Sequence, residues 1–142
     1  MNNMIKREKY LKRIRPFYEQ DLIKVITGIR RCGKSVILNQ IMDELRQSGV
    51  KDEQIIYINF EFTDYIDIND AKKFNDFIEK KLINKNKYYV FFDEIQNVDR
   101  WEKVVKSLKA KYNENISIFI TGSNSDLLSG ELATHIAGRY VS

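Results

Sequence analysis

Short apolar runs alternate along this chain with stretches in which apolar residues recur at helical spacing. Four runs of mostly β-branched and aromatic residues, at 22–27, 54–61, 88–92 and 116–120, are typical of buried strands. Strands that alternate with helices form parallel sheets, because each parallel connection needs a crossover segment. The pattern therefore predicts an α/β fold, with a parallel sheet covered by helices on both faces.

The expected helices have recognisable starts and stops in the sequence. Polar residues that cap helix N-termini precede two of them, and glycines follow two others. The apolar positions predict helices at 36–45 with Gly49 as a stop, from Asn69 or Asp70 to Leu82, from Asp99 as N-cap to Tyr112, and at 127–137 with Gly138 as a stop.

An amphipathic segment precedes the first strand. We expect a helix from Asn3 to about Arg15 that ends near Pro16, because the residue before a proline disfavours helical angles. This divides the chain into a basic amphipathic helix at 1–18 and a core at 19–142. The apolar stripe of the helix comprises Met4, Leu11, Ile14 and Tyr18.

Composition narrows the class of protein. The 142 residues carry a net charge of +4 and 43% hydrophobic residues, which are values of a globular domain. No apolar run approaches the roughly 20 residues of a membrane span. The single cysteine and the charged N-terminus without an apolar leader favour the cytoplasm. Residues 1–31 carry nine Lys and Arg against three acids, which suits a solvated helix face or a nucleic-acid contact.

The strongest motif in the chain follows the first strand. Residues 28–35 read G-x-x-x-x-G-K-S, the phosphate-binding loop of P-loop nucleotide hydrolases. Glycines allow this loop to turn its N–H groups inward, and the following helix adds its positive end. The motif places Lys34 on the β- and γ-phosphates. The expected nucleotide contacts are Gly28, Ile29, Arg30, Arg31, Cys32, Gly33, Lys34, Ser35 and Val36.

Two further polar clusters follow strands, Asp93-Glu94 after the third and residues 121–124 after the fourth. In parallel sheets, ligands bind at the carboxyl ends of the strands, so one nucleotide site explains all three clusters. We expect Ser35 to ligate Mg²⁺, and Asp93 to contact the metal directly or through water. We expect Glu94 to act as the general base that activates water. The alternative for Asp93 and Glu94 is a simple turn cap.

Polar residues after the fourth strand are candidates to position the attacking water. Asn124 is the first candidate and Ser123 the second, with an ordinary polar turn as the alternative. Arg139 is the last basic residue of the chain and could stabilise transition-state charge in cis or in trans. A helix-dipole partner is the alternative for this arginine.

These motifs together resemble a known family. The stretches 25–35, 92–98, 120–125, 131–134 and 138–140 look like those of the bacterial and archaeal AAA-like P-loop ATPases. In that family the ATPase domain precedes a C-terminal domain of unknown function with nuclease-like resemblance. The resemblance implies ATP and Mg²⁺ as ligands, a three-layer P-loop NTPase sandwich with sheet order 5-1-4-3-2, and Asp93-Glu94 as the Walker-B pair. It makes Ser123 and Asn124 sensor-like.

The sequence departs from the family at its C-terminal end. It reaches Tyr140 where the fifth strand should begin, so we expect a sheet of order 1-4-3-2 with the fifth strand truncated. That sheet would leave the P-loop strand as an edge strand, which is a liability for aggregation. We therefore expect a fragment whose isolated ATPase activity is weak.

Three functions fit these observations. The first is a Mg²⁺-dependent ATPase core that drives a protein partner or its own C-terminal domain, with oligomerisation left open. The second is a nucleotide-dependent sensor module with little hydrolysis, whose basic residues 1–31 bind DNA or protein. The third is a small-molecule phosphotransferase, which is disfavoured because no acceptor-binding or Arg-rich lid stretch is visible.

Overall fold

The computed structural model describes residues 8–19, 23–26, 31–83, 86–122 and 140–141. Helices and strands alternate through these residues, as the hydrophobic pattern predicts. The main elements are α1 (Glu8–Ile14), β1 (Lys24–Ile26), α2 (Arg31–Gln47), β2 (Ile55–Asn59), α3 (Ala71–Glu79), β3 (Tyr88–Asp93), α4 (Trp101–Tyr112), β4 (Ile116–Thr121) and β5 (Tyr140–Val141). Short 3-10 turns include η1 (Arg15–Phe17) after α1 and η4 (Ile95–Asn97) after β3.

The strands form one parallel sheet in the order β2-β3-β4-β1-β5. The predicted order 1-4-3-2 is confirmed, and β4 lies between β1 and β3 as the resemblance implies. The expectation that β1 is an edge strand is wrong, because β5 pairs with it. Val25 is in register with Tyr140, and Ile26 with Val141. Two residues of β5 are thus enough to cover the outer side of the P-loop strand.

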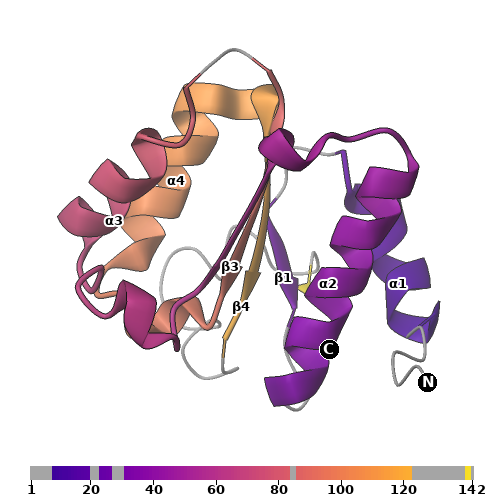
Figure 1. Ribbon diagram of the computed structural model, residues 1–142, viewed down its shortest axis with the longest axis horizontal. Coiled ribbons are helices and arrows are strands. Elements are labelled where there is room, and N and C mark those ends of the chain that lie inside the picture. The colour runs from indigo at the N-terminus through magenta and orange to yellow at the C-terminus, as the bar shows by residue number, and fades with distance from the viewer. Residues whose placement is uncertain (1–7, 20–22, 27–30, 84–85, 123–139, 142) are drawn as a thin grey trace.

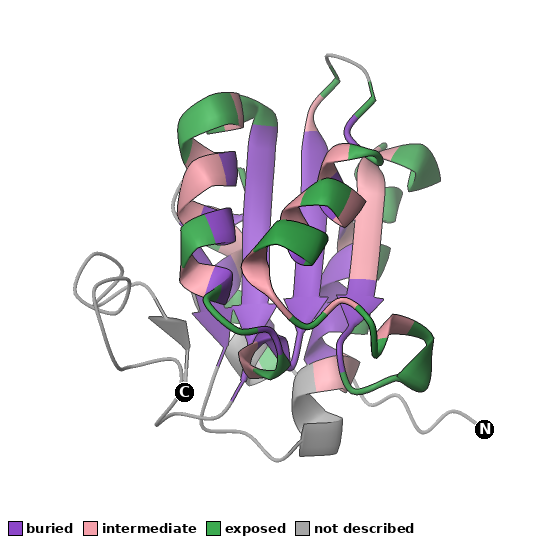
Figure 2. Ribbon diagram, turned by 90° about the vertical axis from the view of Figure 1, so that its left-hand side faces the viewer, coloured by how far each residue is buried: buried purple, intermediate pink, exposed green. Residues whose placement is uncertain are grey.

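Two helical layers cover the sheet, which confirms the α/β class. In Figure 1, α3 and α4 lie on one side of the sheet, and α1 and α2 lie on the other. Buried residues follow the same division, with one core cluster containing Phe74 of α3 and Leu108 of α4, and a second containing Leu11 of α1 and Leu38 of α2. Figure 2 shows the strands as the buried layer between partly exposed helices.

Alternation along the central strands gives their two faces different chemistry. Toward α3 and α4, β3 and β4 present apolar residues, including Val90 and Ile118. Toward α1 and α2, each strand presents a polar residue, a phenylalanine and another polar residue. Phe91 and Phe119 stack at the middle of this face, with ring centroids 4.5 Å apart and planes at 8°. The polar groups are therefore divided between the two ends of the sheet.

The helix ends agree with the sequence in most places. Asp70 caps α3 by accepting a hydrogen bond from the Lys73 N–H at 2.9 Å, and Gly49 after α2 has φ of 108°. The prediction of Asp99 as the N-cap of α4 is wrong. Arg100 holds that position at φ of 57° without a side-chain cap, while the Asp99 N–H is bonded to the Asn69 carbonyl.

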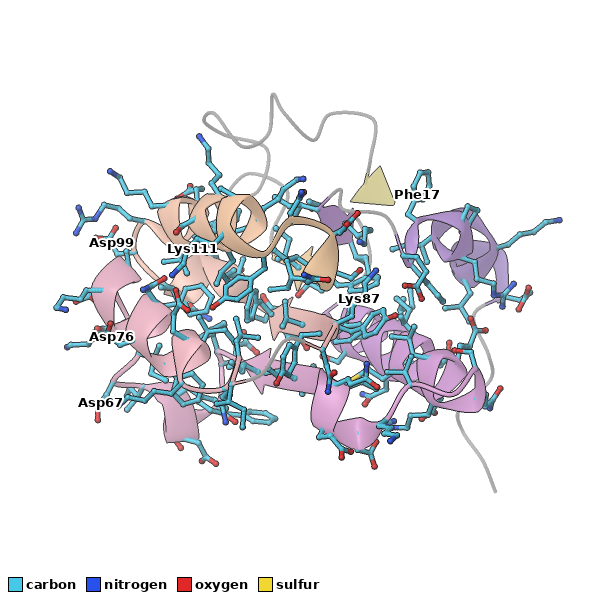
Figure 3. The ribbon with its side chains drawn as sticks, turned by 90° about the horizontal axis from the view of Figure 1, so that it is seen from above. Phe17, Asp67, Asp76, Lys87, Asp99 and Lys111 are labelled. Carbon is cyan, nitrogen blue, oxygen red and sulfur yellow. The ribbon has the colours of Figure 1, made fainter. Side chains whose placement is uncertain are left out.

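The first helix is confirmed over part of its predicted length. It ends at Ile14, and η1 carries the chain through Pro16. Leu11, Ile14 and Tyr18 are buried against α2 and the sheet, so the described part of the predicted stripe is the packed face. Figure 3 shows Phe17 on this side of the molecule and the acids Asp67, Asp76 and Asp99 on the side of α3 and α4.

Some predictions fall on residues outside the described ranges. These are the start of the first helix at 3–7, the loop at 28–30, the helix at 127–137, and the region of Gly138 and Arg139. Within the described residues, no helix is both long and apolar enough to cross a membrane.

Candidate functional site

A buried carboxylate lies at the carboxyl end of β3. Asp93 has 0% exposure and accepts hydrogen bonds from hydroxyl groups on three other elements. Ser35 Oγ of α2 donates to its Oδ2 at 2.6 Å, and the Tyr57 hydroxyl of β2 donates to the same oxygen at 2.7 Å. Thr121 Oγ1 of β4 donates to Oδ1. The side chain is thus held in one orientation from three sides.

The sequence places these donors by strand register. Asn59 of β2 is in register with Asp93, and Tyr57 lies two residues earlier on the same face. The long phenol ring of Tyr57 spans that offset. Thr121 ends β4 on the same face, and Ser35 comes from the first turns of α2, which covers it. The predicted convergence of strand ends therefore occurs for three separate segments.

Neutral hydrogen-bond donors surround the Asp93 carboxylate in the described part of the chain. The described contacts of Asp93 are hydroxyl groups, and no basic side chain is among them. An isolated buried carboxylate is unfavourable unless hydrogen bonds or a cation compensate it. Burial, and then the hydrogen bond to the Asp93 carboxylate, raise the pKa of Tyr57, so its hydroxyl stays protonated as a donor.

The oxygen atoms at this site suit a hard cation. A serine hydroxyl that donates its proton to a carboxylate keeps its lone pairs for a metal, and Mg²⁺ takes one or two protein oxygens with several waters. The residues therefore fit the magnesium that the motif implies. No group of three or more His, Cys, Asp or Glu that could hold a metal occurs within the described residues.

Glu94 follows Asp93 in a left-handed conformation with φ of 56°. This conformation is uncommon for residues other than glycine and occurs often at functional sites. The Glu94 N–H donates to Thr121 Oγ1 at 2.9 Å, so one threonine hydroxyl binds both acidic residues. The residue Glu94 is 4% exposed, and its carboxylate accepts a hydrogen bond from Gln96 Nε2 at 2.9 Å.

The structure brings together several of the predicted site residues. Ser35, Asp93 and Glu94 lie at one end of the sheet with Thr121, the first residue of the predicted polar cluster. The backbone of Arg31 to Val36 forms the start of α2. Predictions for Gly28, Ile29, Arg30, Ser123, Asn124 and Arg139 lie outside the described residues, as do the side chains of Arg31, Cys32 and Lys34.

Sequence reasoning missed two residues of the site. Tyr57 is predicted only as part of the strand at 54–61, and Gln96 only as part of the stretch 92–98 that resembles the AAA-like family. No local signal existed for Tyr57, because its position on the same face as Asp93 depends on the register between β2 and β3. No signal existed for Gln96, since its contact with Glu94 depends on the left-handed turn.

Comparison with known proteins agrees with this geometry. A family model described as an AAA domain matches residues 20–142. The chain belongs to the AAA domain family. Its sheet order and the position of β4 between β1 and β3 are those expected from the AAA-like resemblance, so family and fold support a nucleotide-binding P-loop ATPase core.

Curated relatives of this AAA domain are longer proteins. An uncharacterized protein of Haemophilus influenzae is 48% identical over 139 residues, which are 97% of this chain and 34% of the relative. An uncharacterized protein of Methanocaldococcus jannaschii is 45% identical over 117 residues, which are 82% of this chain and 24% of the relative. The chain thus spans about a third of one relative and about a quarter of the other.

A solved structure shows the same fold. A DNA polymerase III gamma subunit-related protein of Thermotoga maritima superimposes with a TM-score of 0.61 at 15% sequence identity. The match covers 96% of this chain and 46% of that one.

Proposed function

We propose that this AAA domain binds ATP with Mg²⁺ and hydrolyses it, and that hydrolysis is coupled to a partner or to a further domain. The observation that carries the proposal is the buried Asp93, which Ser35 of the phosphate-loop motif contacts at 2.6 Å. A serine of this loop bonded to a strand-end aspartate forms an oxygen pair suited to a nucleotide-bound magnesium.

Each residue has a specific role in this proposal. Ser35 and Asp93 would hold Mg²⁺, which neutralises phosphate charge when bound. Residues 28–36 would bind the phosphates through backbone N–H groups, and Lys34 would bind the β- and γ-phosphates. The hydroxyls of Tyr57 and Thr121 hold the Asp93 carboxylate in one orientation, because they donate hydrogen bonds to it.

Glu94 would take the proton of the attacking water. Glu94 is adjacent to Asp93, the proposed magnesium ligand, and its backbone N–H donates to the Thr121 hydroxyl. Asn124 remains the proposed residue for positioning that water, and Arg139 a proposed stabiliser of transition-state charge. We place this activity in the cytoplasm, where ATP is supplied, with residues 1–18 as a basic helical segment and 19–142 as the catalytic core.

The coupling partner is also part of the proposal. Because the chain covers 34% of the Haemophilus influenzae relative, we infer that the segment or protein driven by hydrolysis lies outside these 142 residues. The alternative of a DNA-binding basic arm has less support. Arg15 of that arm is paired with Glu8 at 2.7 Å and with Glu44 at 2.7 Å, and Lys24 is buried at 1% exposure.

Two substitutions test the proposed function. Lys34→Ala is expected to abolish ATP binding, measured by titration with a fluorescent ATP analogue. Glu94→Gln is expected to bind ATP as the wild type does but to hydrolyse it at least about 100-fold more slowly, as loss of a general base implies. Hydrolysis by Glu94→Gln at the wild-type rate would refute the assignment of Glu94 as the base.

A further inference from the structure

The side chain of Gln96 contacts the proposed catalytic carboxylate. Its Nε2 donates to Glu94 Oε1 at 2.9 Å. Resting on the proposed function, we propose that Gln96 is a positioning residue for ATP hydrolysis, whose amide fixes the Glu94 carboxylate and offers its own oxygen to the attacking water. The contacts of the turn that carries Gln96 support this proposal.

The turn after β3 brings Gln96 and Glu94 onto the same side. In a regular helix, side chains two residues apart do not face each other. Here Glu94 is left-handed, and the 3-10 turn η4 (Ile95–Asn97) follows it directly. The Asn97 side-chain amide donates to the Glu94 carbonyl, not to its carboxylate, at 3.2 Å.

Buried residues on either side hold this turn in place. Ile95 has 0% exposure and Val98 has 1%, and both belong to the core cluster under α3 and α4. The Val98 N–H is bonded to the Ile95 carbonyl at 3.0 Å. Gln96 therefore extends from a rigid turn, and its amide holds Glu94 in a defined position. Such support is what a catalytic group requires for precise orientation.

Chemistry fixes the direction of the Gln96 amide. An ionised carboxylate only accepts hydrogen bonds, so the amide must present its N–H₂ to Glu94 and its oxygen elsewhere. That oxygen is buried and has no hydrogen-bond partner within the described residues. A buried acceptor without a donor is unfavourable, and ordered water commonly satisfies such groups. The Gln96 oxygen is therefore suited to accept from a water close to the carboxylate.

The two ends of the Gln96 amide then have complementary roles. The N–H restrains one oxygen of Glu94, which leaves the other oxygen to take a proton from water. The Gln96 oxygen accepts a second hydrogen bond from the same water and so restricts its rotation. The contribution is to orientation, and we expect it to affect the chemical step while leaving nucleotide binding unchanged.

Gln96→Leu tests this role in the full chain, because leucine has a similar size and lacks both polar atoms. We expect kcat to fall by at least about 10-fold, a part of the effect of the base itself, with KM and the affinity for an ATP analogue changed less than about twofold. In a Glu94→Gln background, Gln96→Leu is expected to cause no further loss, because the two residues act as a unit.

Asn97→Ala is the matched control. It removes a hydrogen bond from the same turn but leaves both amide atoms of Gln96 in place. We expect its kcat to remain within about twofold of the wild type. A loss of kcat in Asn97→Ala equal to that in Gln96→Leu would assign the effect to the turn and overturn the proposal.

A spectroscopic measurement tests the contact without catalysis. In nitrogen-15 NMR spectra, the side-chain amide signal that disappears in Gln96→Leu is assigned to Gln96. We expect this signal to shift in Glu94→Ala and to keep its wild-type position in Asn97→Ala. An unshifted signal in Glu94→Ala would overturn the proposed contact.

The outcomes separate this inference from the proposed function. If Glu94→Gln loses hydrolysis while Gln96→Leu keeps its kcat, the function stands and the role of Gln96 is refuted. A rise in kcat for Gln96→Leu also refutes it, because the amide would then restrain Glu94 rather than prepare it. A wild-type chain that binds ATP without hydrolysing it refutes the proposed function, and the role of Gln96 with it.

Discussion

The two ends of the sheet, on the face that α1 and α2 cover, each contain a buried charge. At the carboxyl end this is Asp93, and at the amino end it is Lys24. The stacked rings of Phe91 and Phe119 lie between them. The two buried side chains differ in whether groups of opposite charge lie near them.

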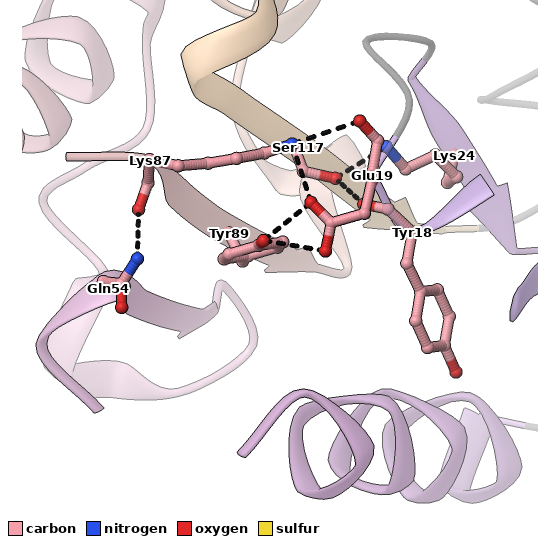
Figure 4. A network of polar contacts seen from close by, with 7 residues as sticks. All are labelled: Tyr18, Glu19, Lys24, Gln54, Lys87, Tyr89 and Ser117. Carbon is pink, nitrogen blue, oxygen red and sulfur yellow. Dashed lines mark hydrogen bonds and ion pairs between the residues drawn. The ribbon is translucent and has the colours of Figure 1, made fainter. Parts of the chain in front are cut away.

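The amino end forms a network that includes groups of opposite charge (Figure 4). Lys24 Nζ donates to Ser117 Oγ at 2.7 Å and lies 4.8 Å from the ring centroid of Phe119. Ser117 Oγ in turn donates to the Tyr18 carbonyl at 2.6 Å. The network thus connects β1 and β4 to the segment that follows η1.

Glu19 supplies the negative charge of this network. Lys87 Nζ lies 2.9 Å from its carboxylate, and the Tyr89 hydroxyl lies 2.7 Å from Oε1. Burial raises the pKa of Glu19, but hydrogen bonds from Lys87 and Tyr89 and the attraction of Lys87 and Lys24 outweigh it. The net result is a pKa of Glu19 below its ordinary value.

The carboxyl end lacks such compensation in its described contacts. Asp93 is surrounded by hydroxyl donors, whereas Lys24 lies close enough to Glu19 to lower the pKa of that acid. A charge balanced within the chain stabilises the fold, whereas an unbalanced buried anion favours binding of a cation. The comparison supports the proposed site at the carboxyl end, where the described contacts of Asp93 include no counter-charge.

The largest expected effect is that of Asp93→Asn on function. We expect Mg²⁺-dependent ATP binding to weaken at least about 100-fold, because the proposed metal ligand loses its charge. The free energy of unfolding without ligand should change by less than about 1 kcal/mol, since removing a buried charge offsets the weaker hydrogen bonds. Nucleotide titration and urea unfolding measure the two quantities. A stability loss above about 3 kcal/mol with intact binding would make Asp93 a structural residue.

Lys24→Met should have the opposite profile. We expect a loss of about 1–3 kcal/mol in the free energy of unfolding, because the Ser117 hydroxyl loses a charged donor in a buried site. ATP affinity should stay within about twofold of the wild type. Lys12→Met, at an exposed position of α1, is the matched control and should be nearly neutral. Weakened ATP binding in Lys24→Met would show that the two ends of the sheet are coupled.

Tyr57→Phe should have a smaller effect at the carboxyl end. The substitution removes one of the two donors to Asp93 Oδ2 and keeps the ring. We expect about 1–2 kcal/mol of lost stability without ligand, as for a hydrogen bond to a charged group. Tyr65→Phe is the control, because the Tyr65 hydroxyl makes no hydrogen bond within the described part of the chain. Equal stability of the two variants would show that the Tyr57 hydroxyl contributes nothing to holding Asp93.

Glu19→Gln should have the smallest effect at neutral pH. The Glu19 carboxylate is largely exposed, so we expect a loss of only a few tenths of a kcal/mol. Because the pKa of Glu19 is lowered in the folded state, its contribution is present above the unfolded pKa and is lost as pH falls below about 4.3. The difference between wild type and variant, followed by thermal unfolding against pH, should shrink through that acidic range. A difference that stays constant down to pH 3 would exclude an ionic origin.

The sequence predicted the fold and the main residues at the carboxyl edge for local reasons. Strands and helices have different hydrophobic periods, so their positions and the α/β class follow from short windows of the chain. The G-x-x-x-x-G-K-S motif identified Ser35, and the acidic pair after an apolar strand identified Asp93 and Glu94. The roles of these three residues remain predictions, although the structure places them at one end of the sheet.

Contacts between distant segments were decided only by the tertiary structure. Tyr57 reaches Asp93 across two paired strands, and β5 covers β1 through a register that no local window shows. Gln96 contacts Glu94 because the backbone of Glu94 is left-handed. The sequence does not predict this conformation, because the residue is neither a glycine nor an asparagine. Hydrophobic period and local motifs are properties of neighbouring residues, whereas the balance of buried charge depends on which segments the fold brings together.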